Sequence, residues 1–490
     1  MGSMRFIFPP DRISDDLIQR AHMSGYDRVP WQVTPSREDC RLCMERPVSD
    51  SGNFHIPWQV KGHGQVTLST ATLMERPEAY HLPLELARGE ISQLRNQLAE
   101  WQAIGLVVPA EVFSGLAEAT GLFGRAISGV QGSSQSNETA DEAIRTAMDA
   151  GRLLAGCYTE QSLAVRRQGA QRLPTLLGAD LGVSPLDEKT SAQCLESFNA
   201  VNLPMVWGEV ETSPKEYNWD VTDRQLDWAR EHGMTVCAGP LLQFSRHTIP
   251  AWLLPFEGDF DSILTFACEY IEEVIQRYRG RIDVWQSAAR PNTATALSLS
   301  EQERVTVAAR AIELTRDLDE NASVVVSFDQ PWAEYLSRQE VDFPPLHFAD
   351  ALNRADLGLS GVMLELNLGY EPGGTLPRSL LDLNRRLDYW SLLNVPLYLT
   401  LCVPSSATPD PLSDQNVAVW PDTWDLGTQQ SWINQHVPLF LSKSYVQGIF
   451  WKQLRDSESH ELPHGGLFDS GGHPKPSLRQ MAALRKAYLR

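Results

Sequence analysis

Short apolar runs alternate with helical segments from about residue 171 to the end of the chain. Eight apolar runs predict strands, at 177–183, 200–207, 235–242, 282–288, 323–328, 361–368, 396–403 and 446–451. Apolar residues at helical spacing predict helices between most of them, including 223–232, 263–278, 301–318 and 380–393. Eight β/α units of this length predict a (β/α)8 TIM barrel, an α/β fold whose chemistry is built at the carboxyl ends of the strands. A doubly wound sheet fits less well, because it has fewer strands and no GxGxxG motif opens the first unit.

The first 85 residues have a different pattern, in which apolar or aromatic stretches such as Phe6–Phe8 are separated by turn residues. This pattern is typical of a small β-sandwich. Residues 86–170 show helical spacing, interrupted by a loop-like stretch at 128–137, and predict a helical linker. We therefore expect a β-sandwich-like domain at 1–85, a helical linker region at 86–170 and the barrel at 171–490.

The tetrapeptide Pro-Trp-Gln-Val occurs twice in the first region, at 30–33 and 57–60. Two copies of four residues are too short for a repeat architecture, so we interpret them as two strands that bury equivalent Trp rings. A sugar-binding role for Trp31 or Trp58 is the alternative.

Charge and composition narrow the range of partners. The chain has 42 Lys and Arg against 62 Asp and Glu, a formal net charge of −20, and we find no basic patch, so we expect no nucleic-acid partner. No apolar run approaches the 18 or so residues of a membrane span, so we expect no membrane partner. The 14 Trp residues favour a partner that stacks on flat rings, sugars among them. The oligomeric state stays open.

Cysteine and histidine motifs do not predict a metal site or a cofactor. The seven cysteines are an odd number scattered along the chain, which is not typical of a disulfide framework. Cys40 and Cys43 form a lone CxxC, and zinc there would need two distant ligands. His460 and His464 have HExxH spacing, but Pro463 argues against the helix that would align both imidazoles. The start Met1-Gly2-Ser3-Met4 is typical of an expression remnant without a signal-peptide core, so we expect a cytoplasmic protein.

Several motifs of the barrel region resemble known enzymes. The segment Trp207–Glu211 with Tyr217–Trp219 is similar to the second β/α unit of retaining glycoside hydrolases with barrel folds. Arg277–Trp285, which leads into the fourth strand, and Phe328-Asp329 at the end of the fifth, resemble glycoside hydrolase family 10, the xylanase family. The order and spacing of these motifs over roughly 175–490 carry the resemblance. It implies a barrel that acts on O-glycosidic bonds of an oligosaccharide or polysaccharide.

The residues at the family's catalytic positions differ. After the fourth strand the family has an Asn-Glu pair that supplies the acid/base, and this chain has Ala289-Arg290. The seventh strand of the family ends in Thr-Glu, which supplies the nucleophile, and this chain has Thr400-Leu401. Retaining hydrolysis needs two carboxyl groups about 5–5.5 Å apart, so this route is closed. Arg290 keeps its proton, but its guanidinium suits a carboxylate or sulfate group, so an anionic oligosaccharide is one candidate substrate.

Two other carboxyl groups are the catalytic candidates. Glu365 lies on the apolar sixth strand, so we expect it to face the barrel mouth with a raised pKa, as a general acid. The alternative is a structural ion pair between Glu365 and Arg290 or Lys452. Asp329, one strand earlier, is the second candidate, and a separation of about 6.5–9.5 Å from Glu365 would permit an inverting mechanism.

The expected substrate-binding residues share a position at or just beyond predicted strand ends. They are Arg290, Asn367, Trp451, Gln243, His247, Glu209, Lys452 and Asp456. We expect Trp451 to stack on a sugar ring, with core packing as the alternative, and Asp456 to lie on the rim. Glu211 is interpreted as a structural residue that holds its loop.

Two functions remain open at this stage. The first is a carbohydrate-active enzyme that uses Glu365, with Asp329, in place of the family's carboxylate pair. The second is a catalytically inactive relative that binds carbohydrate and breaks no bond. An enzyme requires titratable groups that converge on the mouth, whereas a binding protein requires only an aromatic floor and a polar rim.

Overall fold

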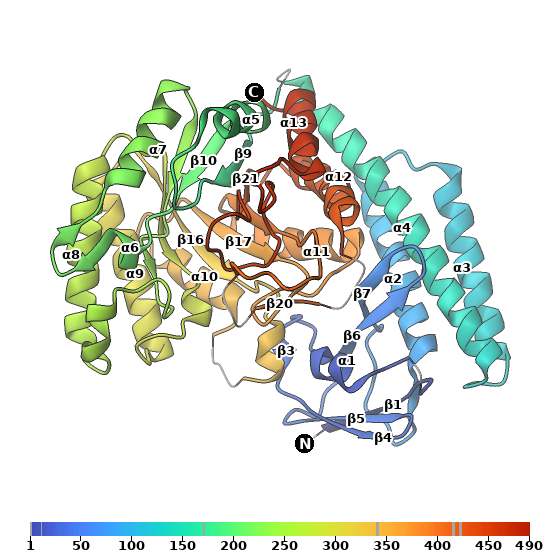
Figure 1. The fold of residues 1–490 in the computed structure, drawn as a ribbon. Helices are drawn as coiled ribbons and strands as arrows, with labels where there is room; N and C mark the ends of the chain where they lie inside the picture. Colours follow the sequence, from blue (N-terminus) through green and yellow to red (C-terminus); the bar gives the residue numbers. More distant parts are fainter. Residues whose placement is uncertain (1, 11, 170–171, 340–342, 414–416, 421–423) are drawn as a thin grey trace. The chain divides into compact units, whose positions relative to one another are not determined.

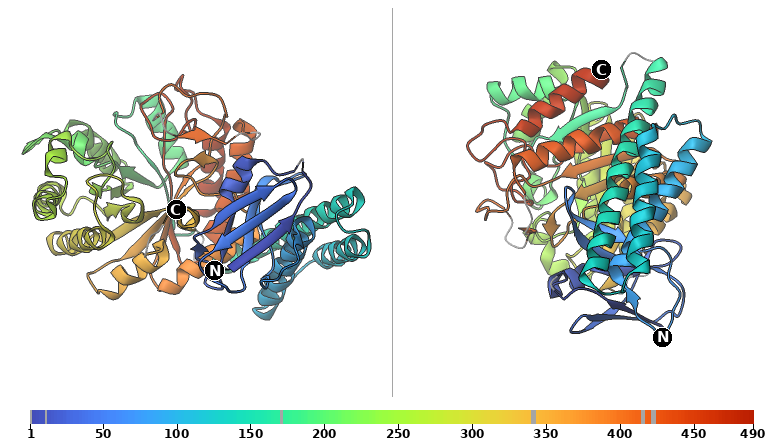
Figure 2. Two further views of the ribbon diagram at one scale, coloured as in Figure 1. Left: turned by 90° about the horizontal axis from the view of Figure 1, so that it is seen from below. Right: turned by 90° about the vertical axis from the view of Figure 1, so that its right-hand side faces the viewer.

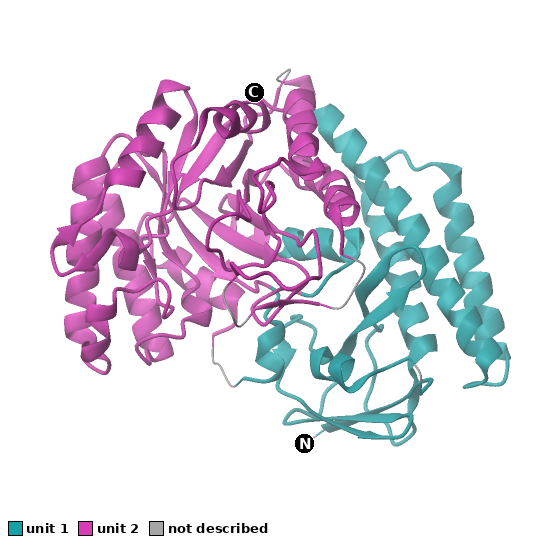
Figure 3. Ribbon diagram, viewed as in Figure 1, with its two compact units in different colours: residues 1–165, 332–341, 376–389 teal, residues 166–331, 342–375, 390–490 magenta. Residues whose placement is uncertain are grey.

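The computed structural model describes residues 2–10, 12–169, 172–339, 343–413, 417–420 and 424–490. The chain forms two compact units (Figure 3). Unit 1 comprises residues 1–165, 332–341 and 376–389, and unit 2 comprises residues 166–331, 342–375 and 390–490. The expected boundary at residues 170 and 171 lies outside the described residues, and the three-part division of the chain stays a prediction.

Unit 2 contains a closed ring of eight parallel strands (Figure 1). They are β9 (Leu176–Asp180), β10 (Ala200–Leu203), β13 (Thr235–Ala238), β15 (Val284–Ala289), β16 (Ser323–Asp329), β17 (Gly361–Asn367), β19 (Leu397–Cys402) and β21 (Val446–Trp451). The strands pair in the order β13-β10-β9-β21-β19-β17-β16-β15, and a pairing of β13 with β15 closes the ring. Each predicted strand overlaps one of these eight, so the (β/α)8 barrel is confirmed.

Helices of unit 2 lie outside this ring, as the view from below shows (Figure 2, left). They are α5 (Glu188–Ser197), α7 (Asp220–Glu231), α8 (Phe260–Tyr278), α9 (Glu301–Leu318), α10 (Pro345–Arg354), α12 (Leu426–Ser442) and α13 (Pro476–Tyr488). The predicted helices at 223–232, 263–278 and 301–318 correspond to α7, α8 and α9. A capping box of Ser300 and Glu303 starts α9, because each side chain binds an otherwise unpaired backbone N–H of the other.

Short elements lie in the loops that join these strands and helices. They are α6 (Trp207–Val210), β11 (Glu211–Ser213), β12 (Glu216–Tyr217), β14 (Leu242–Gln243), η1 (Ala251–Phe256), η2 (Pro291–Thr293), η3 (Glu334–Ser337), β18 (Tyr370–Glu371), η4 (Ser391–Leu393) and β20 (Ala418–Val419). The predicted helix at 380–393 is α11 (Leu380–Trp390), followed by η4. In the described part of the chain, none of the helices combines the length and the apolar character that a bilayer crossing requires.

The barrel interior is filled by a layer of side chains from seven strands. The layer consists of Ala200, Cys237, Val284, Val325, Met363, Tyr398 and Phe450. The remaining strand, β9, packs the half-buried Leu176 against this layer. It also contributes Gly178, where a Cβ would lie 2.7 Å from the Phe450 ring and 2.9 Å from the Ala200 carbonyl oxygen. The barrel is therefore a packed core below its carboxyl ends, and glycine is required where Phe450 crosses β9.

Unit 1 contains two four-stranded sheets with one shared core. The first has the order β4 (Thr34–Glu38), β5 (Arg41–Arg46), β1 (Gly2–Ile7), β8 (Tyr80–His81), and the second β3 (Pro30–Trp31), β2 (His22–Ser24), β6 (Asn53–Val60), β7 (Gly64–Ser69). Phe6 of the first sheet stacks on Phe54 of the second, with 4.4 Å between ring centroids. The predicted β-sandwich-like fold is confirmed. The two repeated Trp residues are not equivalent, because Trp58 is buried whereas Trp31 is half-buried beneath Arg46.

The remaining helices of the N-terminal region are α1 (Asp15–Arg20), α2 (Leu82–Ala103), α3 (Ala110–Ser128) and α4 (Ser134–Gln168). The helix pattern from residue 86 is confirmed by α2, and the second helical pattern by α4. The loop-like stretch at 128–137 is shorter than expected, because α4 begins at Ser134. The third helix, α3, lies within the region 86–170 for which a helical linker was predicted.

Replacement of Gly178 by Ala is expected to lower the free energy of unfolding by about 1–3 kcal/mol, because the new methyl group would press on Phe450 and on backbone. Gly156→Ala is the matched control, since a Cβ there meets nothing within 4 Å and alanine is the better helix former. It should raise the free energy of unfolding by about 0.5–1 kcal/mol. Chemical denaturation measures both changes, and equal stability of Gly178→Ala and wild type would contradict the packing argument.

Candidate active site at the barrel mouth

Polar and charged side chains gather at the carboxyl ends of the barrel strands. Arg290 directly follows β15, Asp329 ends β16, and Glu365 and Asn367 lie on β17. Lys452 directly follows β21. The structure thus brings together five residues that the sequence pattern had singled out, at the end of the barrel where (β/α)8 proteins carry their active sites.

Glu365 is the centre of this group. Arg290 Nε and Nη2 donate to Glu365 Oε2 at 2.9 and 2.8 Å, and Lys452 Nζ donates to the same oxygen at 2.6 Å. Ser327 Oγ donates to the other oxygen, Oε1, at 2.9 Å. With its side chain 3% exposed, the Glu365 carboxylate is fixed by two cations and a hydroxyl.

These contacts overturn the expected raised pKa of Glu365. Burial alone would raise the pKa, but the Arg290 and Lys452 cations outweigh burial and hold the pKa of Glu365 well below its ordinary value. At neutral pH this carboxylate has no proton to donate, so a general-acid role for Glu365 is wrong. The alternative reading, a structural ion pair with Arg290 and Lys452, is what the structure contains.

Glu461 binds the same two cations from the loop that follows β21. Arg290 Nη1 and Nη2 donate to Glu461 Oε1 and Oε2 at 2.6 and 2.9 Å, and Lys452 Nζ lies 3.6 Å from Oε2. Burial alone would raise the pKa of Glu461, but the Arg290 and Lys452 cations outweigh burial and lower the pKa to about 2. We call Arg290, Lys452, Glu365 and Glu461 the charge quartet. Its two positive and two negative groups compensate one another.

The backbone at Arg290 has a φ of 53° and ψ of 39°, the left-handed region that non-glycine residues rarely adopt. Such a conformation persists where surrounding contacts hold it, and it is concentrated at functional sites. Here the guanidinium contacts to both carboxylates of the quartet supply that restraint.

Asp329 has the protonation behaviour that was expected of Glu365. It lies beside Glu365 in the β16–β17 register and is 4% exposed. Burial raises the pKa of Asp329 to about 6; nearby Arg290 opposes this shift and Glu365 adds to it. Asn367 Nδ2 lies 3.5 Å from Asp329 Oδ1. A carboxyl group that changes protonation near neutral pH suits general acid/base chemistry.

Asp180, at the end of β9, is a carboxyl group that the sequence analysis missed. Burial raises its pKa to about 6 as well, against hydrogen bonds from Gly182 N at 2.9 Å and Asn202 Nδ2 at 2.7 Å. In the ring order, β9 and β16 are four strands apart in either direction, so Asp180 and Asp329 stand on opposite walls of the mouth. The signal was present, because an acidic residue ends an apolar strand, as at Asp329.

Each of these two aspartates has an asparagine partner with an unsatisfied oxygen. Asn202 Oδ1, beside Asp180, and Asn367 Oδ1, beside Asp329, are buried and have no hydrogen-bond partner within the described residues. Buried polar atoms are normally paired, so such acceptors point to a ligand or water that donates to them. The mouth therefore has two Asp–Asn pairs, each with one free acceptor.

Two other expected binding residues have structural roles instead. Trp451 is fully buried, and its Nε1 donates to the Gly465 carbonyl oxygen at 2.8 Å, so its ring is covered by protein and does not stack on a sugar. Asp456 is 3% exposed and pairs with buried Lys475 and with Gly466 N, so it holds a loop and does not lie on the rim. Both errors arise because loop residues after β21 fold back over the strand end.

Gln243, His247 and Glu209 are the remaining expected binding residues. Gln243 pairs in register with Ala289, the residue before Arg290. Gln243 is half-buried, whereas His247 and Glu209 are exposed. No hydrogen bond or ion pair of the described residues joins any of the three to the quartet, and their binding roles stay predictions. Glu211 accepts from Trp207 Nε1 and from Lys215 N, both at 2.7 Å, which fits the loop-holding role expected of it.

His460 and His464 are arranged around a carboxylate. His460 Nε2 lies 3.0 Å from Asp410 Oδ2, and the backbone N–H of His464 donates to the same oxygen at 2.9 Å. Cys40 and Cys43 are half-buried and not disulfide-bonded. Over the described ranges, no set of three or more His, Cys, Asp and Glu side chains could hold a metal ion. The HExxH-like spacing therefore serves a loop contact.

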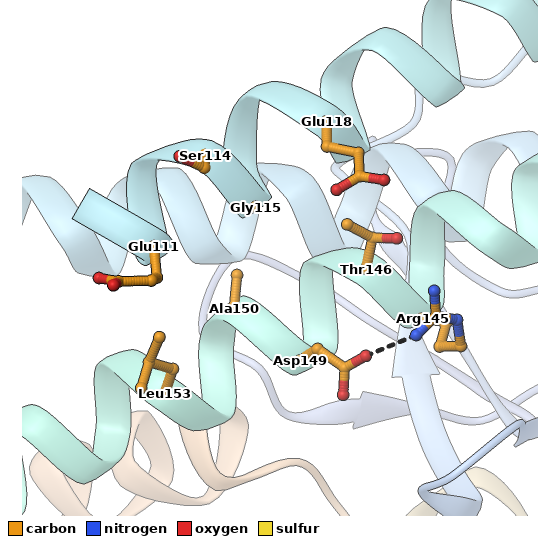
Figure 4. Close-up of a pocket in the computed structure, with 9 residues that line it drawn as sticks. All are labelled: Glu111, Ser114, Gly115, Glu118, Arg145, Thr146, Asp149, Ala150 and Leu153. Atoms are coloured by element: carbon orange, nitrogen blue, oxygen red, sulfur yellow. Dashed lines mark hydrogen bonds and ion pairs between the residues drawn. The ribbon is translucent and has the colours of Figure 1, made fainter. Parts of the chain in front are cut away.

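A separate pocket in unit 1 lies between α3 and α4 (Figure 4). It has a volume of about 370 Å³ and is lined by Glu111, Ser114, Gly115, Glu118, Arg145, Thr146, Asp149, Ala150 and Leu153. Arg145 is engaged with Asp149 at 2.8 Å, and Gly115 permits the close approach to Ala150. The lining offers three carboxylates and an arginine that is already paired, so the barrel mouth is the better candidate for chemistry.

The fold and the mouth together define a (β/α)8 barrel with a charged site at its carboxyl ends. Residues 176–291 match the family model of glycosyl hydrolase family 10. The match runs from β9 to the residue after Arg290. The resemblance to family 10 that the motifs indicated is thus confirmed for the first four strands of the barrel.

Curated relatives are xylanases. Endo-1,4-beta-xylanase 3 of Hypocrea jecorina (strain QM6a) is 24% identical over 152 residues, which are 31% of this chain and 36% of the relative. Beta-1,4-xylanase of Dictyoglomus thermophilum is 32% identical over 81 residues, 16% of this chain and 22% of the relative. The chain therefore spans little more than a third, or less, of the curated relatives that it matches.

Solved structures similar to this chain include two further xylanases. Native xylanase 10B from Thermotoga maritima gives a TM-score of 0.49 at 16% identity and covers 66% of this chain and 98% of its own. Xylanase 10B from Thermotoga petrophila RKU-1 in complex with xylobiose gives a TM-score of 0.49 at 17% identity and also covers 66% of this chain and 98% of its own.

Glu365→Gln is expected to lower the free energy of unfolding by about 3–5 kcal/mol, because it leaves the half-buried Arg290 and Lys452 cations with one carboxylate between them. Urea denaturation at pH 7 measures the change. Glu313→Gln, which breaks an exposed pair with Arg310, is the control and should change the value by less than about 1 kcal/mol. A similar small effect at both positions would mean that the quartet does not stabilise the barrel.

The stability of Asp329→Asn relative to wild type is expected to increase as the pH rises, because wild type loses stability and the variant does not. The pKa of Asp329 is about 6 in the fold and about 3.9 when unfolded, so the folded state holds the proton more tightly between these values. The stability of wild type therefore falls as the pH rises from about 4 to 6 and stays lower above, whereas asparagine does not titrate. Melting temperatures of both proteins at pH 4 to 8 test this, and a difference independent of pH would refute it.

Proposed function

We propose that the barrel mouth is a carbohydrate-active site of the glycoside hydrolase type, which acts on O-glycosidic bonds of an oligosaccharide. The observation that carries this proposal is the pair of Asp–Asn sites on opposite walls of the mouth, each with a protonatable carboxyl group and a buried free acceptor. Sugar hydroxyl groups are donors that suit such acceptors. The family 10 match of the first four strands supports the same class of substrate.

In this proposal Asp329 carries the catalytic proton. A retaining mechanism needs two carboxyl groups about 5–5.5 Å apart, whereas an inverting mechanism needs a wider gap with room for a water molecule. Asp180 and Asp329 stand on opposite walls, which favours the inverting arrangement. One carboxyl group would protonate the leaving oxygen while the other activates water, and a pKa near 6 allows either role at neutral pH.

Glu365 acts as a positioning residue in this scheme. It holds Arg290 and Lys452 through Oε2, and Arg290 in turn lies close enough to Asp329 to lower its pKa. The guanidinium of Arg290 suits a carboxylate or sulfate on the sugar, which makes an anionic oligosaccharide the finer proposal.

Carbohydrate binding without bond cleavage is the second candidate function. It is favoured by the positions that the family 10 resemblance assigns to the acid/base and the nucleophile. Arg290 stands at the first, and Leu401, which is fully buried, stands at the second. A barrel with these residues retains a polar mouth for a glycan but lacks the standard retaining pair.

Release of aryl alcohol or reducing ends from a panel of neutral and acidic glycosides tests the proposal. Turnover by wild type should fall by about 10² or more in Asp329→Asn, because the proton-transfer group is lost. The wild-type pH profile should have a transition near pH 6, where Asp329 titrates. Asp227→Asn is the matched control. Asp227 is an exposed residue of α7 that pairs with Arg281, so its replacement should leave turnover unchanged.

Three outcomes separate the candidates. Turnover that survives in Asp329→Asn would remove Asp329 from the mechanism. Absence of turnover on every glycoside, while an oligosaccharide still raises the melting temperature, would favour the binding function. Absence of both effects would contradict both functions.

A further inference from the structure

We infer that Glu461 is an internal carboxylate ligand which occupies an acid-binding position formed by Arg290 and Lys452, and that the carboxylate of a sugar acid takes its place. The inference deepens the proposed carbohydrate function and rests on it for the class of ligand. It assigns the specificity of the mouth to one displaceable side chain.

The contact geometry is that of carboxylate recognition. Arg290 Nη1 and Nη2 donate in parallel to the two oxygens of Glu461, at 2.6 and 2.9 Å. Lys452 Nζ lies 3.6 Å from Oε2 and adds a second cation. A planar guanidinium fork matches two carboxylate oxygens in this way, and the carboxylate of a uronic acid presents the same two oxygens.

The two carboxylates of the quartet differ in how firmly they are built in. Glu365 belongs to strand β17, is 3% exposed and accepts a further hydrogen bond from Ser327. The Glu461 side chain is 36% exposed and comes from a loop. Solvent and ligand therefore reach Glu461, whereas Glu365 is the fixed counter-charge.

Displacement of Glu461 requires only a side-chain rotation. Its carbonyl oxygen accepts from Ser413 Oγ at 3.1 Å. The next residue, Leu462, is 2% exposed and packs in a cluster with Tyr370 and Cys402. These contacts hold the backbone at 461–462, so the carboxylate can leave the Arg290 fork while the loop stays in place.

The vacated position distinguishes an acid from a neutral sugar. With Glu461 rotated away, Arg290 Nη1 loses its carboxylate partner, and a guanidinium N–H without an acceptor is unfavourable on a side chain that is only 13% exposed. A sugar carboxylate restores both parallel contacts and the negative charge. A neutral hydroxymethyl group offers a single oxygen and no charge, so it restores less.

Glucuronate and glucose, which differ at C6 by a carboxylate against a hydroxymethyl group, are the matched probes. Their Kd values for full-length wild type, Glu461→Gln and Glu461→Ala are measured by titration calorimetry or ligand-observed NMR. Removal of the internal competitor should tighten glucuronate binding by about tenfold or more and leave glucose binding unchanged. Glu458→Gln, which removes a carboxylate from the same loop that pairs with Arg455, is the control and should not change glucuronate binding.

The double variant Arg290→Lys, Glu461→Ala should lose the tighter glucuronate binding of Glu461→Ala, because lysine lacks the two-donor fork. Unchanged or weaker glucuronate binding in both folded Glu461 variants, or an equal gain in Glu458→Gln, would overturn the inference. The proposed hydrolysis is tested by different outcomes. Tightened glucuronate binding without turnover of any glycoside would support the inference and contradict hydrolysis. Turnover of a glycoside without tighter glucuronate binding in the Glu461 variants would support hydrolysis and contradict the inference.

Discussion

The barrel mouth depends on the compensation of two half-buried cations. Arg290 and Lys452 both reach one oxygen of Glu365, which is almost fully buried, and Glu461 completes the balance from a loop. An uncompensated charge in this position would be strongly unfavourable, so none of the four side chains is independent of the others. The quartet fixes the orientation of Arg290, and it takes Glu365 out of the set of groups that exchange protons.

Proton exchange is left to other carboxyl groups. Asp329 is buried and Asp180 is half-buried, and both are only partly compensated, so loss of solvation raises the pKa of each to about 6. This reverses the assignment that a strand pattern suggests, in which the carboxylate with the most apolar neighbours has the raised pKa. The decisive factor is the number of cations within reach, which depends on Arg290 and Lys452, the residues that directly follow strands β15 and β21.

Much of the fold was predictable from local patterns. All eight barrel strands and the four helices named between them correspond to elements of the structure, because apolar runs and helical spacing reflect which faces are buried. The five polar residues of the mouth could be named because charged residues at strand ends meet at one end of a barrel. Trp451 and Asp456 were misassigned, since the loop after β21 folds back and buries both side chains.

The sequence by itself determined the barrel, the sandwich and the residues at the strand ends, because these follow from burial patterns that repeat along the chain. Tertiary structure alone decided which of those residues are paired. Glu461 lies 171 positions from Arg290, and Lys452 lies 87 positions from Glu365, yet both pairs are in hydrogen-bond contact. Electrostatic energies depend on distances of a few ångströms between such residues, and linear spacing carries no information about those distances.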